Sequence, residues 1–184
     1  MDRPFGKGDV LVSTIGLLDP NFQHTVVFLC EHLDGQGSYG LILNRALRVP
    51  PQLEREMPYV GNRLFQGGPV QPEVMQVLHG LGDGVPGAVE VIPGVWLGGD
   101  FEALQSGFAS GVYSPEACRF FLGYSGWAKG QLAAEFKENT WIAVGATREM
   151  VFDTPPDQVW GEAIRKRGES DPLYAHYPRN PSWN

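Results

Sequence analysis

Short apolar runs separated by glycine- and proline-containing turns occupy most of the chain, which predicts many strands and few long helices. The clearest strand covers residues 25–32, where both alternating faces are apolar until the last two positions. A strand that is apolar on both faces is expected at the centre of a sheet, covered on each side. Strict alternation would place His32 on the face of Cys30, with Glu31 on the opposite face.

A hairpin is expected to follow this strand. Residues 34–37 (DGQG) form a turn signal, and residues 39–44 are again strongly apolar. The second strand of the hairpin would end at the polar pair Asn44 and Arg45. The remaining strands are expected at residues 10–15, 63–66, 74–79, 89–92, 95–98, 118–124 and 141–144.

Helical signals are fewer and lie mostly in the second half of the chain. Residues 50–57 suit one or two helical turns that start with proline, and Asp100 is a suitable N-cap for a helix at residues 101–110. Further helices are expected at about residues 130–139 and from Pro155 onward. Strands with helices interspersed late predict one mixed α/β (α+β) domain. We expect this domain to span residues 1–167, followed by a proline-rich tail at residues 168–184.

Composition narrows the functional classes. The 184 residues carry 14 basic and 21 acidic side chains, a net charge of −7, and the one dense basic cluster (residues 165–167) ends a predicted helix, where cations complement the helix dipole. This pattern argues against direct nucleic-acid binding. Cys30 and Cys118 lie in apolar runs and are expected to be buried free thiols. No apolar run is long enough to span a membrane and residues 1–10 lack a signal core, so we expect a cytoplasmic protein without membrane contacts.

Several motifs occur together in one order: DPNFQHTVVFLCEH, GLILNR, GGPV, LH and GYSGWAKGQL. In this respect the chain resembles the YqgE/AlgH family of bacterial proteins over about residues 8–165. The resemblance implies a single compact domain with a bifurcated, partly barrel-like mixed β-sheet flanked by helices. It implies no established biochemical activity, although one branch is named as a regulator of alginate synthesis. Ala46 replaces the proline that is usual in the family, and Gln76 replaces a frequent phenylalanine.

Three catalytic or metal-binding arrangements are incomplete in this sequence. Ser125 lies in GYSGW, which resembles the G-x-S-x-G nucleophile elbow, but Trp127 occupies a position that needs glycine, so a tight turn between strand and helix is preferred. Cys30, His32 and His79 lack the spacing of a metal-binding motif. A carboxylate pair of Glu31 with Glu73 or Asp100 is open, although Asp100 already suits a helix cap. No catalytic residue, metal ligand or cofactor is therefore predicted.

A ligand-binding surface is the remaining prediction. Polar or aromatic side chains at strand ends and at one helix start offer hydrogen bonds, charge and a stacking face. The candidate ligand-binding residues are Glu31, His32, Asn44, Arg45, His79, Trp127 and Gln131. The leading hypothesis is a non-enzymatic protein that binds a small molecule or a protein partner, with a regulatory role. The alternatives are a small hydrolase that uses Ser125 or a His32/Glu31 pair, and a transcriptional regulator that acts on DNA.

Overall fold

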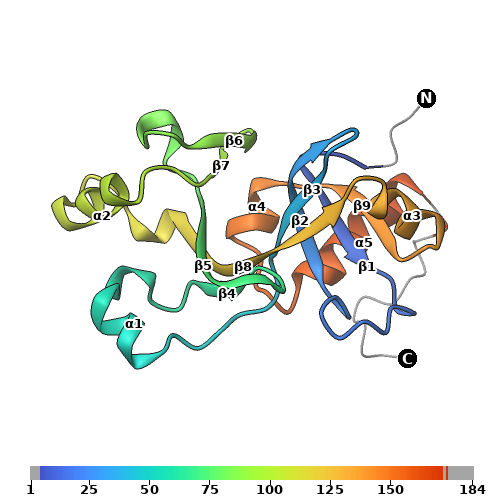
Figure 1. Ribbon diagram of the computed structural model, residues 1–184, viewed down its shortest axis with the longest axis horizontal. Coiled ribbons are helices and arrows are strands. Elements are labelled where there is room, and N and C mark those ends of the chain that lie inside the picture. Colours follow the sequence, from blue (N-terminus) through green and yellow to red (C-terminus); the bar gives the residue numbers. More distant parts are fainter. Residues whose placement is uncertain (1–4, 172, 174–184) are drawn as a thin grey trace.

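A nine-stranded sheet organises residues 5–171 and 173, which are the residues that the computed structural model describes (Figure 1). The strand order is β6-β7-β5-β8-β3-β2-β1-β9, and β4 pairs with β8 beside this path. The strands are β1 (Asp9–Ser13), β2 (Val26–Leu33), β3 (Gly37–Ile42), β4 (Leu64–Gln66), β5 (Val70–His79), β6 (Val89–Ile92), β7 (Val95–Leu97), β8 (Cys118–Ala128) and β9 (Trp141–Gly145).

The sheet divides along β8, which runs between the two halves of the molecule (Figure 1). Residues 120–122 of β8 pair with β4 in parallel and with β5 in antiparallel orientation, whereas residues 125–128 pair with β3. The sheet also curls, since Lys7 Nζ donates a hydrogen bond to the Glu90 carbonyl oxygen of β6 at 2.9 Å. It stays open, with β6 and β9 at the two ends of the strand order. The expected bifurcated mixed sheet in one α/β domain is confirmed.

Five α-helices flank the sheet within the described residues. They are α1 (Pro51–Glu56), α2 (Phe101–Ser110), α3 (Gln131–Lys137), α4 (Arg148–Phe152) and α5 (Val159–Ser170). Asp100 caps α2 as predicted, because its Oδ1 accepts a hydrogen bond from Ala103 N at 2.7 Å. The last helix begins at Val159, not at Pro155, and it ends at Ser170. Beyond Asp171 and Leu173, the predicted proline-rich tail lies outside the described residues.

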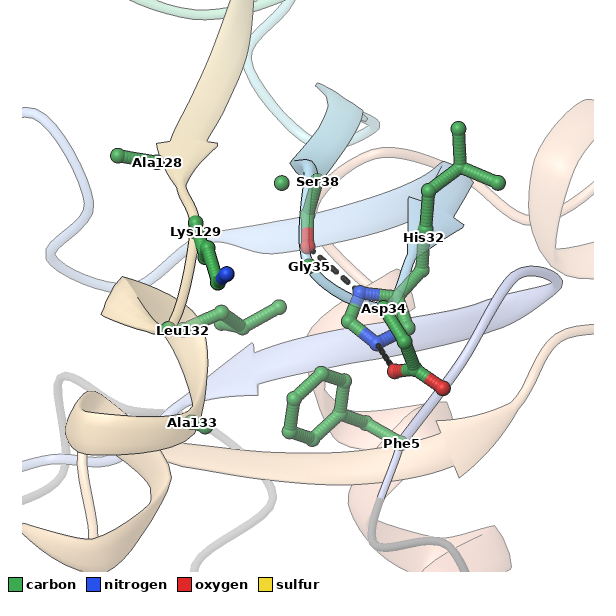
Figure 2. A pocket seen from close by; sticks show the side chains of 12 residues that line it. Phe5, His32, Asp34, Gly35, Ser38, Ala128, Lys129, Leu132 and Ala133 are labelled. Atoms are coloured by element: carbon green, nitrogen blue, oxygen red, sulfur yellow. Dashed lines mark hydrogen bonds and ion pairs between the residues drawn. The ribbon is translucent and has the colours of Figure 1, made fainter.

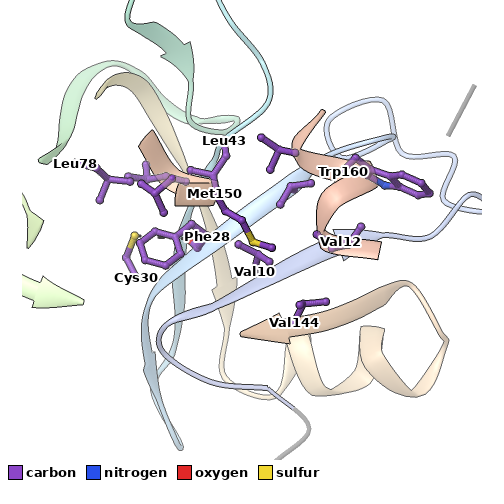
Figure 3. Packing of buried hydrophobic residues seen from close by; sticks show 14 of the residues in the cluster. Val10, Val12, Phe28, Cys30, Leu43, Leu78, Val144, Met150 and Trp160 are labelled. Carbon is purple, nitrogen blue, oxygen red and sulfur yellow. Dashed lines mark hydrogen bonds between the residues drawn. The ribbon is translucent and has the colours of Figure 1, made fainter. Parts of the chain in front are cut away.

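Apolar side chains on both faces of β2 place the core, as the sequence predicts for a central strand. Val26 and Phe28 belong to a cluster that α4 and α5 cover, in which Trp160 is the largest fully buried side chain (Figure 3). The Trp160 indole also donates a hydrogen bond to the Ser13 carbonyl oxygen at 3.1 Å. Val27 and Leu29 belong to the opposite cluster, which α3 covers. A third cluster lies under α1 and α2.

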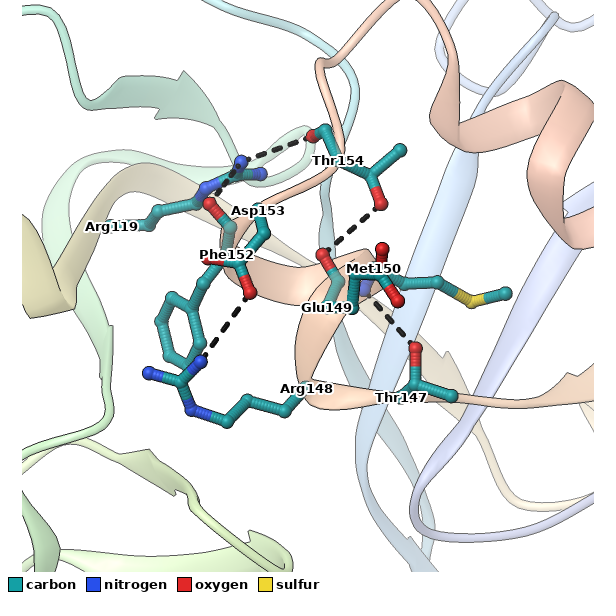
Figure 4. Close-up of polar contacts among 8 residues, drawn as sticks. All are labelled: Arg119, Thr147, Arg148, Glu149, Met150, Phe152, Asp153 and Thr154. Atoms are coloured by element: carbon teal, nitrogen blue, oxygen red, sulfur yellow. Dashed lines mark hydrogen bonds and ion pairs between the residues drawn. The ribbon is translucent and has the colours of Figure 1, made fainter.

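Helix α4 was not expected from the sequence, because its five residues are too few for an apolar period to be read. Thr147 caps it by accepting a hydrogen bond from Met150 N at 3.2 Å. At its other end, the Arg119 guanidinium of β8 donates to the carbonyl oxygens of Phe152 and Thr154 at 3.0 and 3.2 Å (Figure 4). Burial lowers the pKa of Arg119, and the nearby Asp153 carboxylate partly opposes this shift.

Strand β8 corrects one sequence expectation. It extends to Ala128, so the glycine-rich stretch at residues 123–127 is part of a strand and not a turn before a helix. Both cysteines are buried free thiols, as predicted, and burial raises the pKa of the Cys118 thiol to about 12. Of the helices described, none has the length and apolar character that a membrane span requires.

Candidate functional site

A cavity of about 330 Å³ opens between the β2–β3 hairpin and the junction of β8 with α3 (Figure 2). Most of its lining is apolar, and three side chains with hydrogen-bonding or charged groups, His32, Ser38 and Asp34, come from the hairpin. Lys129 enters from the other side, after the end of β8. The lining residues are Phe5, His32, Leu33, Asp34, Gly35, Gly37, Ser38, Ala128, Lys129, Gly130, Leu132 and Ala133.

A β-bulge directs His32 into this cavity. Leu29 pairs with Gly40 and His32 pairs with Ser38, so β2 holds one extra residue between two registers of β3. Cross-strand partners point to the same side of a sheet, and Gly40 and Ser38 share a face because they are two positions apart. His32 therefore lies on the face of Leu29. The sequence expectation that it shares the face of Cys30 is wrong for this reason.

The His32 imidazole is held from three directions. Its Nδ1 lies 2.8 Å from Ser38 Oγ, and its Nε2 lies 3.2 Å from Asp34 Oδ1. The Phe5 ring packs edge-on against it, with centroids 4.9 Å apart, and stacks on Phe136 of α3. The imidazole side chain is 14% exposed, whereas the Asp34 carboxylate is 89% exposed. A carboxylate beside Nε2 favours the tautomer with the proton on Nε2, which leaves Nδ1 as the acceptor for the Ser38 hydroxyl.

The charged side chains lie on two opposite rims of the cavity: Asp34 on the rim that the β2–β3 hairpin forms, and Lys129 on the rim that the end of β8 forms. Asp34 on the hairpin is directed at His32 (Figure 2), whereas the exposed Lys129 has no carboxylate partner among the residues that the structure describes. The floor between them consists of Phe5 and Leu132, both almost completely buried. This arrangement can accommodate an apolar group on the floor and an anionic group beside the lysine.

Two of the predicted site residues bind backbone groups of the β1–β2 loop and of the start of β2, and neither lines the cavity. Asn44 accepts a hydrogen bond from Val26 N at 2.9 Å and donates one to the His24 carbonyl oxygen at 2.8 Å. Arg45 donates to the carbonyl oxygens of Pro20 and Gln23 at 2.9 and 3.3 Å. Burial is the main cause that lowers the pKa of Arg45. The two side chains thus organise the loop between β1 and β2.

Trp127 and Gln131 meet at a different point, on Glu135 of α3. The Trp127 indole donates to Glu135 Oε2 at 2.9 Å, and the Trp141 indole donates to the same oxygen at 2.7 Å. Gln131 donates to Glu135 Oε1 at 3.0 Å and accepts from Ala128 N at 3.0 Å. Glu135 therefore ties α3, which contributes Leu132 and Ala133 to the cavity lining, to β8 and β9.

Of the seven predicted site residues, only His32 lines the cavity. Glu31 is exposed and pairs with Tyr39 in the β2–β3 register, so the carboxylate beside His32 is Asp34 instead. His79 is fully buried at the far end of β5. A role of the other six in ligand binding stays a prediction.

His79 is bonded in its neutral form. Its Nε2 lies 3.0 Å from the Gly98 carbonyl oxygen, and its Nδ1 accepts a hydrogen bond from Leu81 N at 3.3 Å. Burial lowers the pKa of His79, and the bond to Gly98 partly opposes the shift. Because the unfolded chain keeps a histidine pKa of about 6.5, the unfolded state binds the proton first as the pH falls. Stability from this group is therefore present at higher pH and is lost on acidification.

We expect the free energy of unfolding to fall between pH 7.5 and pH 5.5, with His79 contributing at most about 1.4 kcal/mol per pH unit. His79→Gln removes this titration, so the difference between the two pH values should shrink relative to the unmodified chain. Urea denaturation at both pH values measures it. His24→Asn, at a loop position with φ of 56°, is the matched control and should keep the full difference. An equal pH dependence in all three proteins would contradict the assignment.

Ser125 is placed where the nucleophile elbow cannot form. It lies inside β8, is completely buried, and its hydroxyl donates to the Gly67 carbonyl oxygen at 3.1 Å. Neither an imidazole nor a carboxylate is its hydrogen-bond partner in the described part of the chain. Cys30 and His32 lie on opposite faces of β2. Among the described residues, no three His, Cys, Asp or Glu side chains are grouped so that they could hold a metal ion.

Comparisons with known proteins give consistent matches over nearly the whole chain. A family model described as AlgH-like matches residues 10–171. A UPF0301 protein of Chlorobaculum tepidum is 40% identical over 178 residues, which cover 96% of this chain and 95% of the relative. A UPF0301 protein of Bacteroides thetaiotaomicron is 34% identical over 180 residues, which cover 97% of this chain and 91% of the relative.

Solved structures share the fold. The solution structure of the AlgH protein from Pseudomonas aeruginosa is similar with a TM-score of 0.73 and 29% identity, and the match covers 97% of each chain. The crystal structure of a Corynebacterium diphtheriae protein also has a TM-score of 0.73, at 22% identity, over 96% of this chain and 95% of that one. The second likeness concerns the fold alone.

Proposed function

The chain belongs to the YqgE/AlgH family of AlgH-like proteins, and membership in this family does not identify a reaction. From the cavity at His32 we propose that the protein binds a small organic anion with an apolar body. The cavity at His32 carries the proposal. Its volume of about 330 Å³ lies within the range of small-molecule sites, and its lining is mostly apolar with few polar groups. A cytoplasmic, regulatory binding protein is the role that we propose for such a site.

The chemistry of the ligand follows from the two rims. Lys129 supplies a positive charge that no described carboxylate neutralises, so a carboxylate or a similar anion suits it. Phe5 and Leu132 offer an apolar floor for a short aliphatic chain or an aromatic ring system. The net charge of −7 disfavours a large polyanion such as a nucleic acid. His32 is the one predicted site residue that we retain as a ligand contact.

Binding of an aromatic anion tests this function. We expect 8-anilinonaphthalene-1-sulfonate to bind with increased fluorescence and to be displaced by hexanoate more effectively than by hexanol. Ala133→Trp should fill the cavity and weaken binding at least about 10-fold, a difference of about 1.4 kcal/mol. Ala134→Trp is the matched control, since Ala134 is exposed on the same helix but does not line the cavity.

The charge requirement is tested separately. Lys129→Met should remove the preference of the site for hexanoate over hexanol, whereas Lys137→Met, at an exposed position at the end of α3, should keep it. For the two alanine variants of the binding test, equal affinities of Ala133→Trp and Ala134→Trp for 8-anilinonaphthalene-1-sulfonate would show that the anion binds elsewhere and would reject the proposal.

A further inference from the structure

We propose that Ser38 is an activated nucleophile that accepts an acyl group in this cavity, with His32 as its general base. The proposal rests on the proposed function, because the acyl donor must first occupy the cavity. Ser38, His32 and Asp34 all line it and form one chain of contacts (Figure 2). The carboxylate of Asp34 lies 3.2 Å from Nε2 of the imidazole, and Nδ1 lies 2.8 Å from the serine hydroxyl oxygen.

The geometry gives each group a defined role. Asp34 holds the proton on Nε2, so the Nδ1 lone pair faces the Ser38 hydroxyl and can take its proton. Phe5 fixes the plane of the imidazole by its edge-on contact. Ser38 itself is fixed between two strands, since it pairs with His32 of β2 and with Trp127 of β8. Such fixed positions keep the serine and its base within reach of each other.

The contrast with Ser125 shows that this arrangement is specific. Ser125 also lies in a strand next to β3, yet its hydroxyl is buried and donates to the Gly67 carbonyl oxygen. Ser38 is partly exposed at the cavity and has an imidazole as its partner. Only the second serine therefore combines a base with access to a small molecule.

The reaction balances with an ester of a small carboxylic acid as the donor. Ser38 Oγ attacks the carbonyl carbon while its proton moves to His32 Nδ1, and a C–O bond forms. An uncharged ester leaves Lys129, which also lines the cavity, available to stabilise the developing oxyanion. Collapse breaks the bond to the leaving alkoxide, which takes the proton from His32 and departs as an alcohol. Acyl-Ser38 remains.

A fluorophosphonate probe tests the nucleophile directly. We expect an adduct on Ser38, located by peptide mass spectrometry, with fluoride released and the hydroxyl proton passed to His32. Ser38→Ala should abolish the adduct, and His32→Gln should slow its formation at least about 100-fold. Asp34→Asn should slow it less, since the carboxylate is exposed. Ser106→Ala, at an exposed serine of α2, is the control and should leave labelling unchanged.

Folding and binding are separated from reactivity. His32→Asn serves as a second variant, and thermal unfolding establishes that the compared proteins are folded. An equal rate of labelling in the His32 variants, or no adduct on Ser38 at saturating probe, overturns the inference. Binding of 8-anilinonaphthalene-1-sulfonate without a Ser38 adduct would overturn this inference alone, whereas the absence of both would also reject the proposed function.

Discussion

Replacing Gly67 with alanine is expected to destabilise the fold by more than about 4 kcal/mol, a loss that few single substitutions cause. Gly67 lies where the chain leaves β4 and passes against β8. A Cβ atom there would meet the Gly123 carbonyl oxygen closer than real Cβ atoms approach backbone, and Leu41 Cδ2 at 2.9 Å. The obstacle is mainly backbone of a paired strand, which cannot move aside as a side chain would. The close approach of residue 67 to β8 therefore requires a residue without a Cβ atom.

Gly145→Ala is the matched control for this substitution. Gly145 also lies at the end of a strand, but a Cβ atom there has nothing within 4 Å. We expect urea denaturation followed by circular dichroism to show a normal midpoint for Gly145→Ala. For Gly67→Ala we expect an unfolded chain or a midpoint at much lower urea. Similar midpoints for the two variants would mean that β4 and β8 can separate without cost.

A continuous run of apolar residues predicted the centre of the fold well. The strand predicted at residues 25–32 forms as β2 (Val26–Leu33), a central strand with a core on each face, because every position from Val26 to Cys30 is apolar and such a run is covered on both sides. The N-cap at Asp100 was equally predictable, since an aspartate just before a helix can accept a hydrogen bond from a free backbone N–H of the first helical turn. The apolar run and the N-cap residue are both features of a few adjacent residues, so the sequence alone was enough to predict this strand and this helix start.

The register of the hairpin could not be read from the sequence. The bulge in β2 leaves the composition of the strand unchanged, yet it transfers His32 from the face of Cys30 to the face of Leu29. Once the register is known, the pairing of His32 with Ser38 follows directly. The sequence analysis therefore missed Ser38 as a partner of His32. The two residues can be recognised as cross-strand neighbours only when the number of residues in the turn between the strands is known.

The remaining site residues depend on contacts between distant segments. Phe5 reaches the cavity because the chain before β1 packs against α3, where its ring stacks on Phe136 at 4.4 Å. Ser125 resembled a turn because glycines surround it, but Gly123 lies in β8 and lets this strand pass close to the backbone of Gly68 and Val70. A glycine-rich stretch serves both purposes, and only the tertiary structure distinguishes them.

After Gly67→Ala, loss of the Glu135 side chain should have the next largest effect on the free energy of unfolding. In the sequence, Glu135 looks like an ordinary glutamate on the surface of a helix. One of its oxygens accepts hydrogen bonds from the indoles of Trp127 and Trp141, each only 4% exposed. Glu135→Ala leaves both indole N–H groups without this acceptor. Hydrogen bonds to a charged group contribute about 1.5–3 kcal/mol each, so we expect a loss of roughly 3 kcal/mol.

Two further variants separate the hydrogen bonds from the charge. Glu135→Gln keeps one oxygen that both indoles can reach, so its cost should be about 1 kcal/mol. Glu138→Ala removes an exposed carboxylate at the end of the same helix and should change the free energy of unfolding by less than about 0.5 kcal/mol. Urea denaturation followed by tryptophan fluorescence, to which both indoles contribute, measures the stability of all three variants. Since α3 forms one wall of the cavity, Glu135→Ala should also weaken binding of the aromatic anion. A loss no larger than that of Glu138→Ala would show that packing alone holds the helix in place.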